Sequence, residues 1–245
     1  MKLPIYLIVA MLFLGCRAQN AIHTNGLGLP SEVRRLVGAS RYSYDSGHRW
    51  IVAKVGDTIS SGALIQTAEN SKLTLLLGET TGSGSYATGK SGVFNPEVYP
   101  CNLLGLEQNS ALRIAQLTAL DPSGPRKTER ICLVLSAGTI RGHVRRPSAG
   151  FSYQIAFANA VARIDNGIYW LSSQGILRVY QGAVLIETVS TKVTKSISAG
   201  KEFNVYSGTI TDLPSLPANW MHDFWLPSDP AYEDWGKPPL RKNRK

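Results

Sequence analysis

Short runs of alternating apolar and polar residues, separated by glycine, dominate two stretches of the chain. In the first stretch, from residue 50 to 77, such runs lie at residues 51–55, 58–59, 63–67 and 73–77. In the second, from residue 131 to about 210, they include residues 151–155, 176–180, 184–186 and 203–205. Strands of this length with glycine between them are typical of all-β proteins. The pattern therefore predicts an all-β fold.

The same runs identify a core. Because successive side chains of a strand point to opposite faces, every second apolar residue of a run should face inwards. We expect seven such residues in the core: Ile65, Leu73, Leu75, Ile140, Ile155, Val179 and Val184. Two glycine-containing pairs, Asn166-Gly167 and Gln181-Gly182, lie between runs and predict hairpin or corner turns.

Residues 79–130 separate the two β stretches as an insertion. Residues 79–103 are rich in Gly, Ser, Thr and Pro and predict an extended loop. Residues 109–120 are expected to form one helix, because Leu112, Ala115, Gln116 and Ala119 recur at helical spacing. Nearer the N-terminus, residues 31–36 could form one or two helical turns.

The first 18 residues resemble a secretory signal peptide. Lys2 precedes an uncharged apolar run at residues 3–14, and small residues follow it. The run of about a dozen residues is shorter than the ~20 that span a bilayer as a helix. Two processing routes are open: Cys16 could be the lipidated first residue of a loose lipobox, or cleavage could follow Ala18. The sequence thus predicts an exported protein that is periplasmic, membrane-anchored as a lipoprotein, or secreted.

The charge of the chain gives a weaker signal. The net charge is +9, and removal of Lys2 and Arg17 with a leader would lower it by two, to +7. The basic residues are dispersed rather than gathered on one element with stacking aromatics, so nucleic-acid binding is not expected. Weak attraction to an anionic envelope surface is the milder expectation.

If Cys16 is lipidated or removed with the leader, the mature chain keeps two free cysteines, Cys101 and Cys132. In an oxidising compartment they are a candidate disulfide, which would stabilise the fold by roughly 3 to 4 kcal/mol on the chain-entropy estimate. The alternative is two separate buried thiols, because Cys132 lies in an apolar run where free cysteine often packs. No Cys/His cluster has zinc spacing, and we expect neither a metal nor a cofactor.

The C-terminal segment, residues 212–245, combines prolines with aromatic residues and ends on a basic run. Prolines disfavour a regular strand or helix, so this segment is expected to be an extended tail. Four of its aromatic residues are candidates for binding a partner: Trp220, Phe224, Trp225 and Trp235. The alternative is that they cover an exposed sheet face of their own domain.

Residues 84–91, GSYATGKS, fit the phosphate-binding loop pattern at every position. Such a loop needs a strand before it and a helix after it. Here Gly92 and Pro96 follow at once and would break that helix, and an exported protein meets little ATP. A Gly/Ser-rich loop without a nucleotide is therefore the favoured interpretation.

Other catalytic patterns are also missing from the sequence. It contains neither a G-x-S-x-G elbow nor an H-E-x-x-H motif. The four histidines (His23, His48, His143 and His222) are scattered, with no acidic neighbour at diagnostic spacing. We expect no enzyme and no catalytic residues, although a hydrolase site built from distant residues would be invisible at this level.

Several segments resemble successive steps of the FecR domain. Residues 55–67 match its opening, a hydrophobic-Gly-Asp-x-Ile turn around Gly56, Asp57 and Ile59, and residues 73–75 match the following L-x-L strand. Residues 135–140, 151–164, 179–184 and 197–201 resemble its later steps in the same order. One departure is Gly167-Ile168, where the family carries Gly-Thr.

The resemblance covers about residues 50–80 and 131–206, within a predicted β domain at residues 50–210. It implies a short β-solenoid-like or β-sandwich fold and an exported, non-catalytic binding or scaffolding module of the bacterial envelope, engaged in protein-protein interaction or signalling. This chain has a signal peptide where the best-known family members have an anti-sigma domain. An envelope protein is the expected partner. A cell-wall or glycan-binding protein is the alternative, for which aromatic residues and positive charge would be apt.

Overall fold

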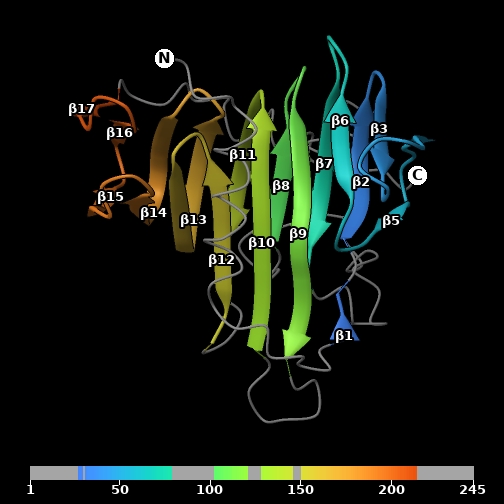
Figure 1. The fold of residues 1–245 in the computed structure, drawn as a ribbon, viewed down its shortest axis with the longest axis horizontal. Helices are drawn as coiled ribbons and strands as arrows, with labels where there is room; N and C mark the ends of the chain where they lie inside the picture. The colour runs from blue at the N-terminus through green and yellow to red at the C-terminus, as the bar shows by residue number, and fades with distance from the viewer. Residues whose placement is uncertain (1–26, 30, 79–101, 121–127, 146–149, 214–245) are drawn as a thin grey trace, which may run out of the picture.

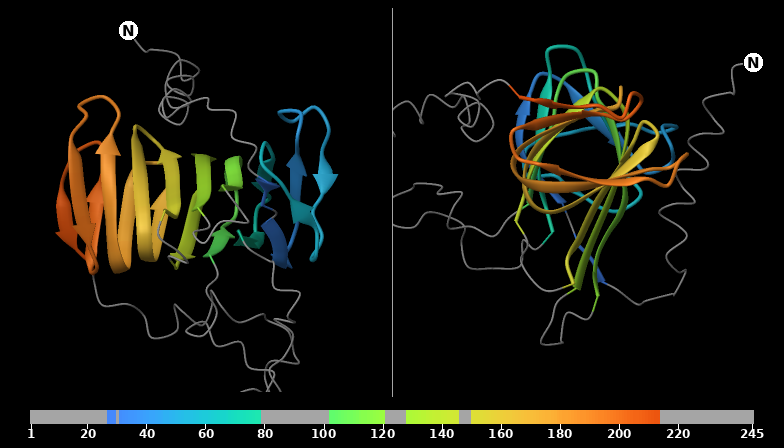
Figure 2. Two further views of the ribbon diagram at one scale, coloured as in Figure 1. Left: turned by 90° about the horizontal axis from the view of Figure 1, so that it is seen from below. Right: turned by 90° about the vertical axis from the view of Figure 1, so that its left-hand side faces the viewer.

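The computed structural model describes residues 27–29, 31–78, 102–120, 128–145 and 150–213. These residues form one curled sheet, and its two halves face each other across a core (Figures 1 and 2). They contain strands and no helix, so the predicted all-β class is confirmed.

The first half, here the first layer, contains nine strands. Their spatial order is β5 (Thr58–Ile59), β2 (Ser31–Val37), β7 (Lys72–Leu77), β8 (Asn102–Leu106), β11 (Thr139–Val144), β13 (Ala160–Ser172), β14 (Ile176–Thr188), β16 (Lys201–Asn204) and β17 (Ile210–Asp212). All neighbours in this layer are antiparallel.

The second layer shares the long strands β13 and β14 with the first. Its spatial order is β4 (Ile51–Val52), β3 (Ser40–Ser43), β6 (Leu64–Thr67), β9 (Ala111–Leu120), β10 (Thr128–Ala137), β12 (Ser152–Phe157), β13, β14 and β15 (Thr194–Ser198), with β1 (Leu27–Gly28) also paired to β9. The pair β10–β12 is parallel, because the intervening β11 lies in the first layer.

Strands β13 and β14 join the two layers. The last part of β13 pairs with β11 of the first layer, and its first part pairs with β12 of the second. Between these parts, Gly167 lies opposite Gly182, and both have positive φ angles. A Cβ atom on Gly167 would lie 2.2 Å from the carbonyl oxygen of Gln181. The turns predicted between strands at these two glycine pairs are therefore wrong, because both pairs lie inside the continuous strands β13 and β14, where the strands pass from one layer to the other.

The core lies between the layers and follows the predicted alternation. All seven predicted core residues are at most 1% exposed, and they belong to one continuous hydrophobic cluster. Burying one Leu or Ile side chain contributes roughly 1.5 to 3 kcal/mol, so this cluster is the main stabilising element of the sheet.

The helix expected at residues 109–120 is wrong, because this segment is strand β9. Leu112 and Ile114 alternate as strand residues, but a bulge follows Ile114, and the next core residue is Leu117. The bulge adds one residue to the strand and produces a three-residue spacing that resembles a helical pattern. The helical turns considered at residues 31–36 are likewise wrong, since this segment is β2 and pairs with β7.

Strands β8 and β9 lie inside the range 79–130 and pair with strands on both sides. The loop expected at residues 79–103 lies outside the described residues except for residues 102 and 103, which begin β8 and are not loop. The signal peptide also lies outside them, and so does the tail expected at residues 212–245, except for residues 212 and 213, the first of which ends β17. Within the described ranges, no helix is long and apolar enough to cross a membrane.

Two equivalent corners connect the layers at one end of the strands. Asn70 and Asn109 each adopt a positive φ angle, 53° and 54°, and each precedes a buried serine. Ser71 Oγ accepts a hydrogen bond from the backbone N–H of Ala39 at 2.8 Å. Ser110 Oγ accepts one from the N–H of Thr139 at 3.0 Å. The two Asn-Ser corners therefore lock neighbouring turns together and fix the strand ends beside them.

Candidate functional site

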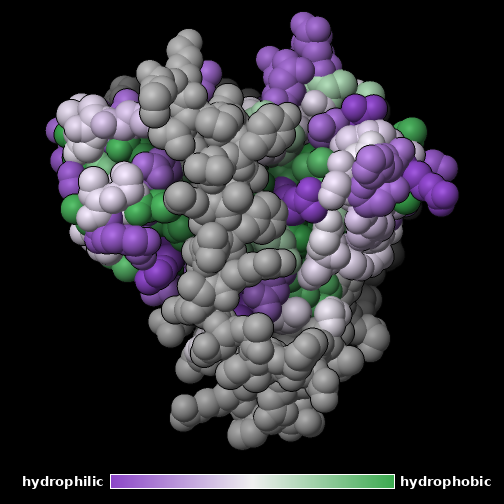
Figure 3. Space-filling view, viewed as in Figure 1, coloured by the Kyte–Doolittle hydropathy of each residue, from purple (hydrophilic) through white to green (hydrophobic). Residues whose placement is uncertain are grey.

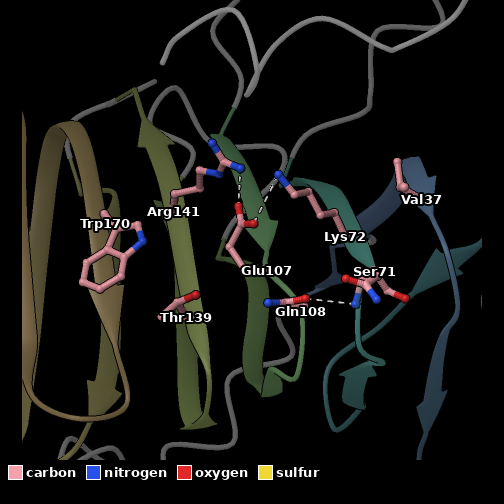
Figure 4. Close-up of a pocket in the computed structure, with 9 residues that line it drawn as sticks. Val37, Ser71, Lys72, Glu107, Gln108, Thr139, Arg141 and Trp170 are labelled. Carbon is pink, nitrogen blue, oxygen red and sulfur yellow. Dashed lines mark hydrogen bonds and ion pairs between the residues drawn. The ribbon is translucent and has the colours of Figure 1, made fainter. Parts of the chain in front are cut away.

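A hollow of about 620 Å³ lies on the outer face of the first layer, beside the two Asn-Ser corners (Figure 4). We call it the corner hollow. It crosses five adjacent strands, and its lining comes from the end of β2, the start of β7, the turn after β8, the start of β11 and the outer face of β13. The lining residues are Val37, Asn70, Ser71, Lys72, Glu107, Gln108, Thr139, Arg141 and Trp170.

A row of directly opposed residues places the charged and aromatic groups at this site. Across the first layer, Arg141 on β11 lies opposite Trp170 on β13, and Trp170 lies opposite Arg178 on β14. The next residue of the row is Glu202 on β16. Opposed residues of neighbouring strands share one face of a sheet, so these four side chains form one outward row.

The floor of the corner hollow is held by three charged side chains. Glu107 forms ion pairs with Arg141 and with Lys72, whose Nζ lies 3.4 Å from a carboxylate oxygen (Figure 4). The side chains of Arg141 and Glu107 are only 10% and 19% exposed, whereas that of Lys72 is 50% exposed. Ion pairs shielded in this way are screened less by salt than surface pairs. The three residues therefore form a fixed floor in which one carboxylate contacts two cations and a net charge of +1 remains.

Trp170 borders one end of the hollow and is held in place from its far side. The guanidinium of Arg178 lies over the indole, 4.6 Å from the ring centroid. Arg178 is itself fixed by a hydrogen bond of 2.6 Å from its Nε to Glu202. A cation over an indole contributes about 0.5 to 1 kcal/mol at an exposed site. The pair thus orients Trp170 as an aromatic wall.

Between the aromatic wall and Val37, several polar atoms of the lining make no hydrogen bond within the described residues. Gln108 Oε1 accepts a hydrogen bond from the N–H of Asn70 at 2.9 Å, so its Nε2 points away, toward Thr139 (Figure 4). Among the described residues, this Nε2, the side-chain amide of Asn70, Thr139 Oγ1 and Trp170 Nε1 have no hydrogen-bond partner. The hollow therefore combines neutral donors and acceptors in one place.

His143 lies two residues beyond Arg141 on the outer face of β11 and does not line the hollow. It is 7% exposed. Burial, together with the charge of Arg145, lowers the pKa of His143 from 6.5 to about 4. His143 is therefore neutral at ordinary pH.

A second hollow, of about 310 Å³, lies near the end of the sheet formed by β14, β15 and β16. Its apolar lining includes Ile186, Phe203 and Val205, and Lys195 donates a hydrogen bond to the carbonyl of Gly208 at 2.8 Å. Its ammonium group also lies 5.4 Å from the centre of the Phe203 ring. Because this lysine is already engaged, the second hollow offers less free polar chemistry than the first.

Exposed apolar side chains are dispersed over the described surface. Val52 and Val55 lie near the end of the sheet formed by β3 and β4, and Val193 and Tyr206 lie near the end formed by β15 and β16. On the face shown in Figure 3, apolar and hydrophilic residues are interspersed. Exposed apolar side chains therefore lie toward both ends of the sheet.

Most of the site residues predicted from sequence lie outside the described residues: Cys16, Cys101, Trp220, Phe224, Trp225 and Trp235. The exception is Cys132, which is 8% exposed on β10 and is disulfide-bonded. Its partner cysteine is outside the described ranges, so pairing with Cys101 stays a prediction. Residues 84–91, the phosphate-loop pattern, also fall outside them. No group of His, Cys, Asp or Glu in the described ranges could hold a metal ion.

Sequence reasoning missed every residue of the corner hollow. Its members are far apart in the chain, and the register of β7, β8, β11 and β13 brings them together. One signal was available: Trp170 stands at an outward position of an alternating strand, where a large aromatic residue needs either a cover or a ligand.

No family model matches the chain, and no curated protein matches it. Two crystal structures of a candidate anti-sigma factor from Parabacteroides distasonis, at 2.50 Å and 1.65 Å resolution, are similar to it in structure. The sequence identities are 12% and 11%, and the TM-score is 0.34 for each. Each match covers 49% of this chain and 54% of the other, so the shared region is about half of either protein. A likeness at this TM-score does not decide fold or function.

Proposed function

We propose that this chain is an exported, non-catalytic FecR-like binding module of the bacterial envelope, and that the corner hollow binds its partner. One observation carries the proposal. The hollow gathers uncommitted polar groups and an oriented tryptophan on the outer face of a sheet, where none of them is needed for the core. Polar groups that converge on a hollow without serving the fold are typical of binding sites.

The sheet makes the corner hollow a preformed surface. Strands β7, β8, β11 and β13 are each hydrogen-bonded to a neighbour on both sides. The Asn-Ser corners fix the ends of these strands. A ligand that binds such a surface loses little affinity to the ordering of the protein. This rigidity supports a binding role.

The chemistry of the hollow favours binding over catalysis. Its lining contains one carboxylate, that of Glu107, which contacts both Lys72 and Arg141. Hydrolysis of a glycosidic bond generally requires a pair of carboxylates on either side of the bond. The lining contains no histidine or cysteine that could act as a general base or nucleophile.

The envelope location rests on the sequence. The signal-peptide pattern at residues 1–18 and the net positive charge fit an exported protein that meets anionic surfaces. The resemblance to the FecR domain supports the same class of module. An envelope protein or a wall component is the partner on this proposal.

Retention of the purified full chain by isolated bacterial envelopes tests the proposal. Gln108→Ala combined with Trp170→Ala should weaken retention about tenfold, as loss of two contacts worth at least 1.4 kcal/mol together would. Gln181→Ala combined with Tyr206→Ala is the matched control, because both residues are exposed and lie outside the hollow. Equal retention of the two double variants would show that the partner binds elsewhere. Thermal melting of each variant checks that the fold is intact.

A further inference from the structure

The geometry points to a neutral saccharide chain as the occupant of the corner hollow. This inference rests on the proposed function and names the chemical class of its ligand. Four observations carry it: the pairing of the floor's cations with Glu107, the neutral polar groups, the position on a sheet face and the oriented indole.

The charges of the floor are used within the protein. Glu107 forms ion pairs with Arg141 and with Lys72, so the guanidinium of Arg141 contacts a carboxylate of the same chain. A site for a phosphate or a peptide carboxylate would instead direct an arginine at the ligand. The floor keeps a net charge of +1, but its arginine is directed at Glu107 and not at a ligand.

The uncommitted groups match hydroxyl and N-acetyl groups. Gln108 Nε2 and Trp170 Nε1 are donors, Thr139 Oγ1 both donates and accepts, and the amide of Asn70 offers a donor and an acceptor. Among the described residues these groups have no hydrogen-bond partner. Neutral donors and acceptors at short intervals are what an array of sugar hydroxyls and acetamido groups requires.

The position of the hollow disfavours an extended peptide. Peptides that join a β-protein by main-chain hydrogen bonds need a free sheet edge. The strands beneath the hollow from β7 to β13 have neighbours on both sides, so no edge is available there. Val37 and Trp170 are the only large apolar residues of its lining, so the hollow offers little apolar surface for the aromatic anchor of a protein partner.

The hollow is elongated across the strands. From β2 to β13 it crosses four strand spacings, or about 19 Å at 4.8 Å per spacing. Trp170 forms one end of this path, and Val37 lies at the other. With one face covered by Arg178, the remaining indole surface can contact the apolar C–H face of a sugar ring. An oligosaccharide laid across the strands would contact every uncommitted group.

Titration of the full chain with chitopentaose, five linked N-acetylglucosamine units, tests the inference. In ¹⁵N-resolved NMR the indole resonance of Trp170, identified by its loss in Trp170→Phe, should shift on addition of the sugar. By calorimetry, Gln108→Ala should weaken binding about tenfold, as loss of about 1.4 kcal/mol of hydrogen bonding to the ligand would. Gln181→Ala should bind as the unchanged chain does.

The outcomes separate this inference from the proposed function. Absence of a Trp170 shift, or equal weakening by Gln108→Ala and Gln181→Ala, would overturn the saccharide inference. If the chain still loses envelope retention with Gln108→Ala and Trp170→Ala, the proposed function survives and the ligand is of another class. If retention is also unaffected, both fail.

Discussion

The pair Tyr153 and Tyr169 gives the sharpest test of how the core is built. The two hydroxyl oxygens lie 2.9 Å apart, and the phenol rings are 2% and 0% exposed. Burial raises the pKa of both phenols, so both stay protonated. Tyr169 fits because Gly142 faces it: a Cβ atom at Gly142 would lie 2.2 Å from its hydroxyl oxygen. The hydrogen bond thus joins β12 and β13 deep inside the molecule.

The change in the free energy of unfolding depends on which polar group each substitution leaves buried in the core. Tyr169→Phe keeps the ring but leaves the hydroxyl of Tyr153 without its hydrogen-bond partner in an apolar site, which lowers the free energy of unfolding by about 1 to 3 kcal/mol. Tyr153→Phe leaves the hydroxyl of Tyr169 without its partner and should lower the free energy of unfolding by a similar amount. The double variant removes both polar groups and keeps the ring pair, whose centroids are 6.3 Å apart. It should therefore be no less stable than either single variant.

Urea unfolding of the full chain and the three variants, followed by circular dichroism, measures these free energies. We expect a double-mutant cycle with a coupling energy of at least about 1 kcal/mol. If the two single costs simply add in the double variant, the hydroxyls do not depend on each other and the account of this core is refuted. A changed m-value would indicate an altered unfolded state and would require a second probe.

Three further predictions concern stability. Ser110→Ala removes the acceptor for the N–H of Thr139 and should cost about 1 to 2 kcal/mol in urea unfolding. The pKa of His143 is lowered to about 4, so the free energy of unfolding should fall by roughly 2 kcal/mol as the pH falls from about 6.5 to about 4, with partial hydration of the ring taken into account. In His143→Gln the free energy of unfolding should depend less on pH over this range. Glu107→Gln removes a carboxylate from beside the poorly exposed Arg141 and should cost about 1 to 3 kcal/mol, whereas Glu187→Gln at an exposed pair should cost at most about 1.

Each of these predictions has a matched control. Ser136→Ala changes an exposed serine and should cost little. His48→Gln changes an exposed histidine and is the matched control for His143→Gln. The sign for His143 follows from proton uptake, since between about pH 4 and 6.5 the unfolded chain binds a proton that the folded chain does not. A stability that rises toward pH 4 would contradict its burial in the neutral form.

The alternation of apolar residues was sufficient to predict the fold class and the core. It worked where strands are regular, as at Leu73 and Leu75, because a period of two has one physical interpretation. It failed at β9, because the bulge after Ile114 produced a helix-like spacing that only the pairing with β10 resolves. Local sequence cannot reveal a bulge when the partner strand is unknown.

The corner hollow could not be predicted, for a related reason. Lys72, Glu107, Arg141 and Trp170 come from four strands or turns, and only the register of the first layer brings them together. Each residue alone looks like an ordinary solvent-facing residue of a strand. The Asn-Ser pairs at residues 70–71 and 109–110 recur in the sequence, and the structure shows that both form corners with the same backbone geometry.

The most direct test of the account is photo-crosslinking from the corner hollow in living cells. A photoreactive residue at position 108 should capture one envelope component, while the same residue at position 181, exposed and away from the hollow, should not. Capture from position 108 alone is the result that the account predicts. Capture from neither position, or equally from both, would contradict the claim that this hollow is the binding surface.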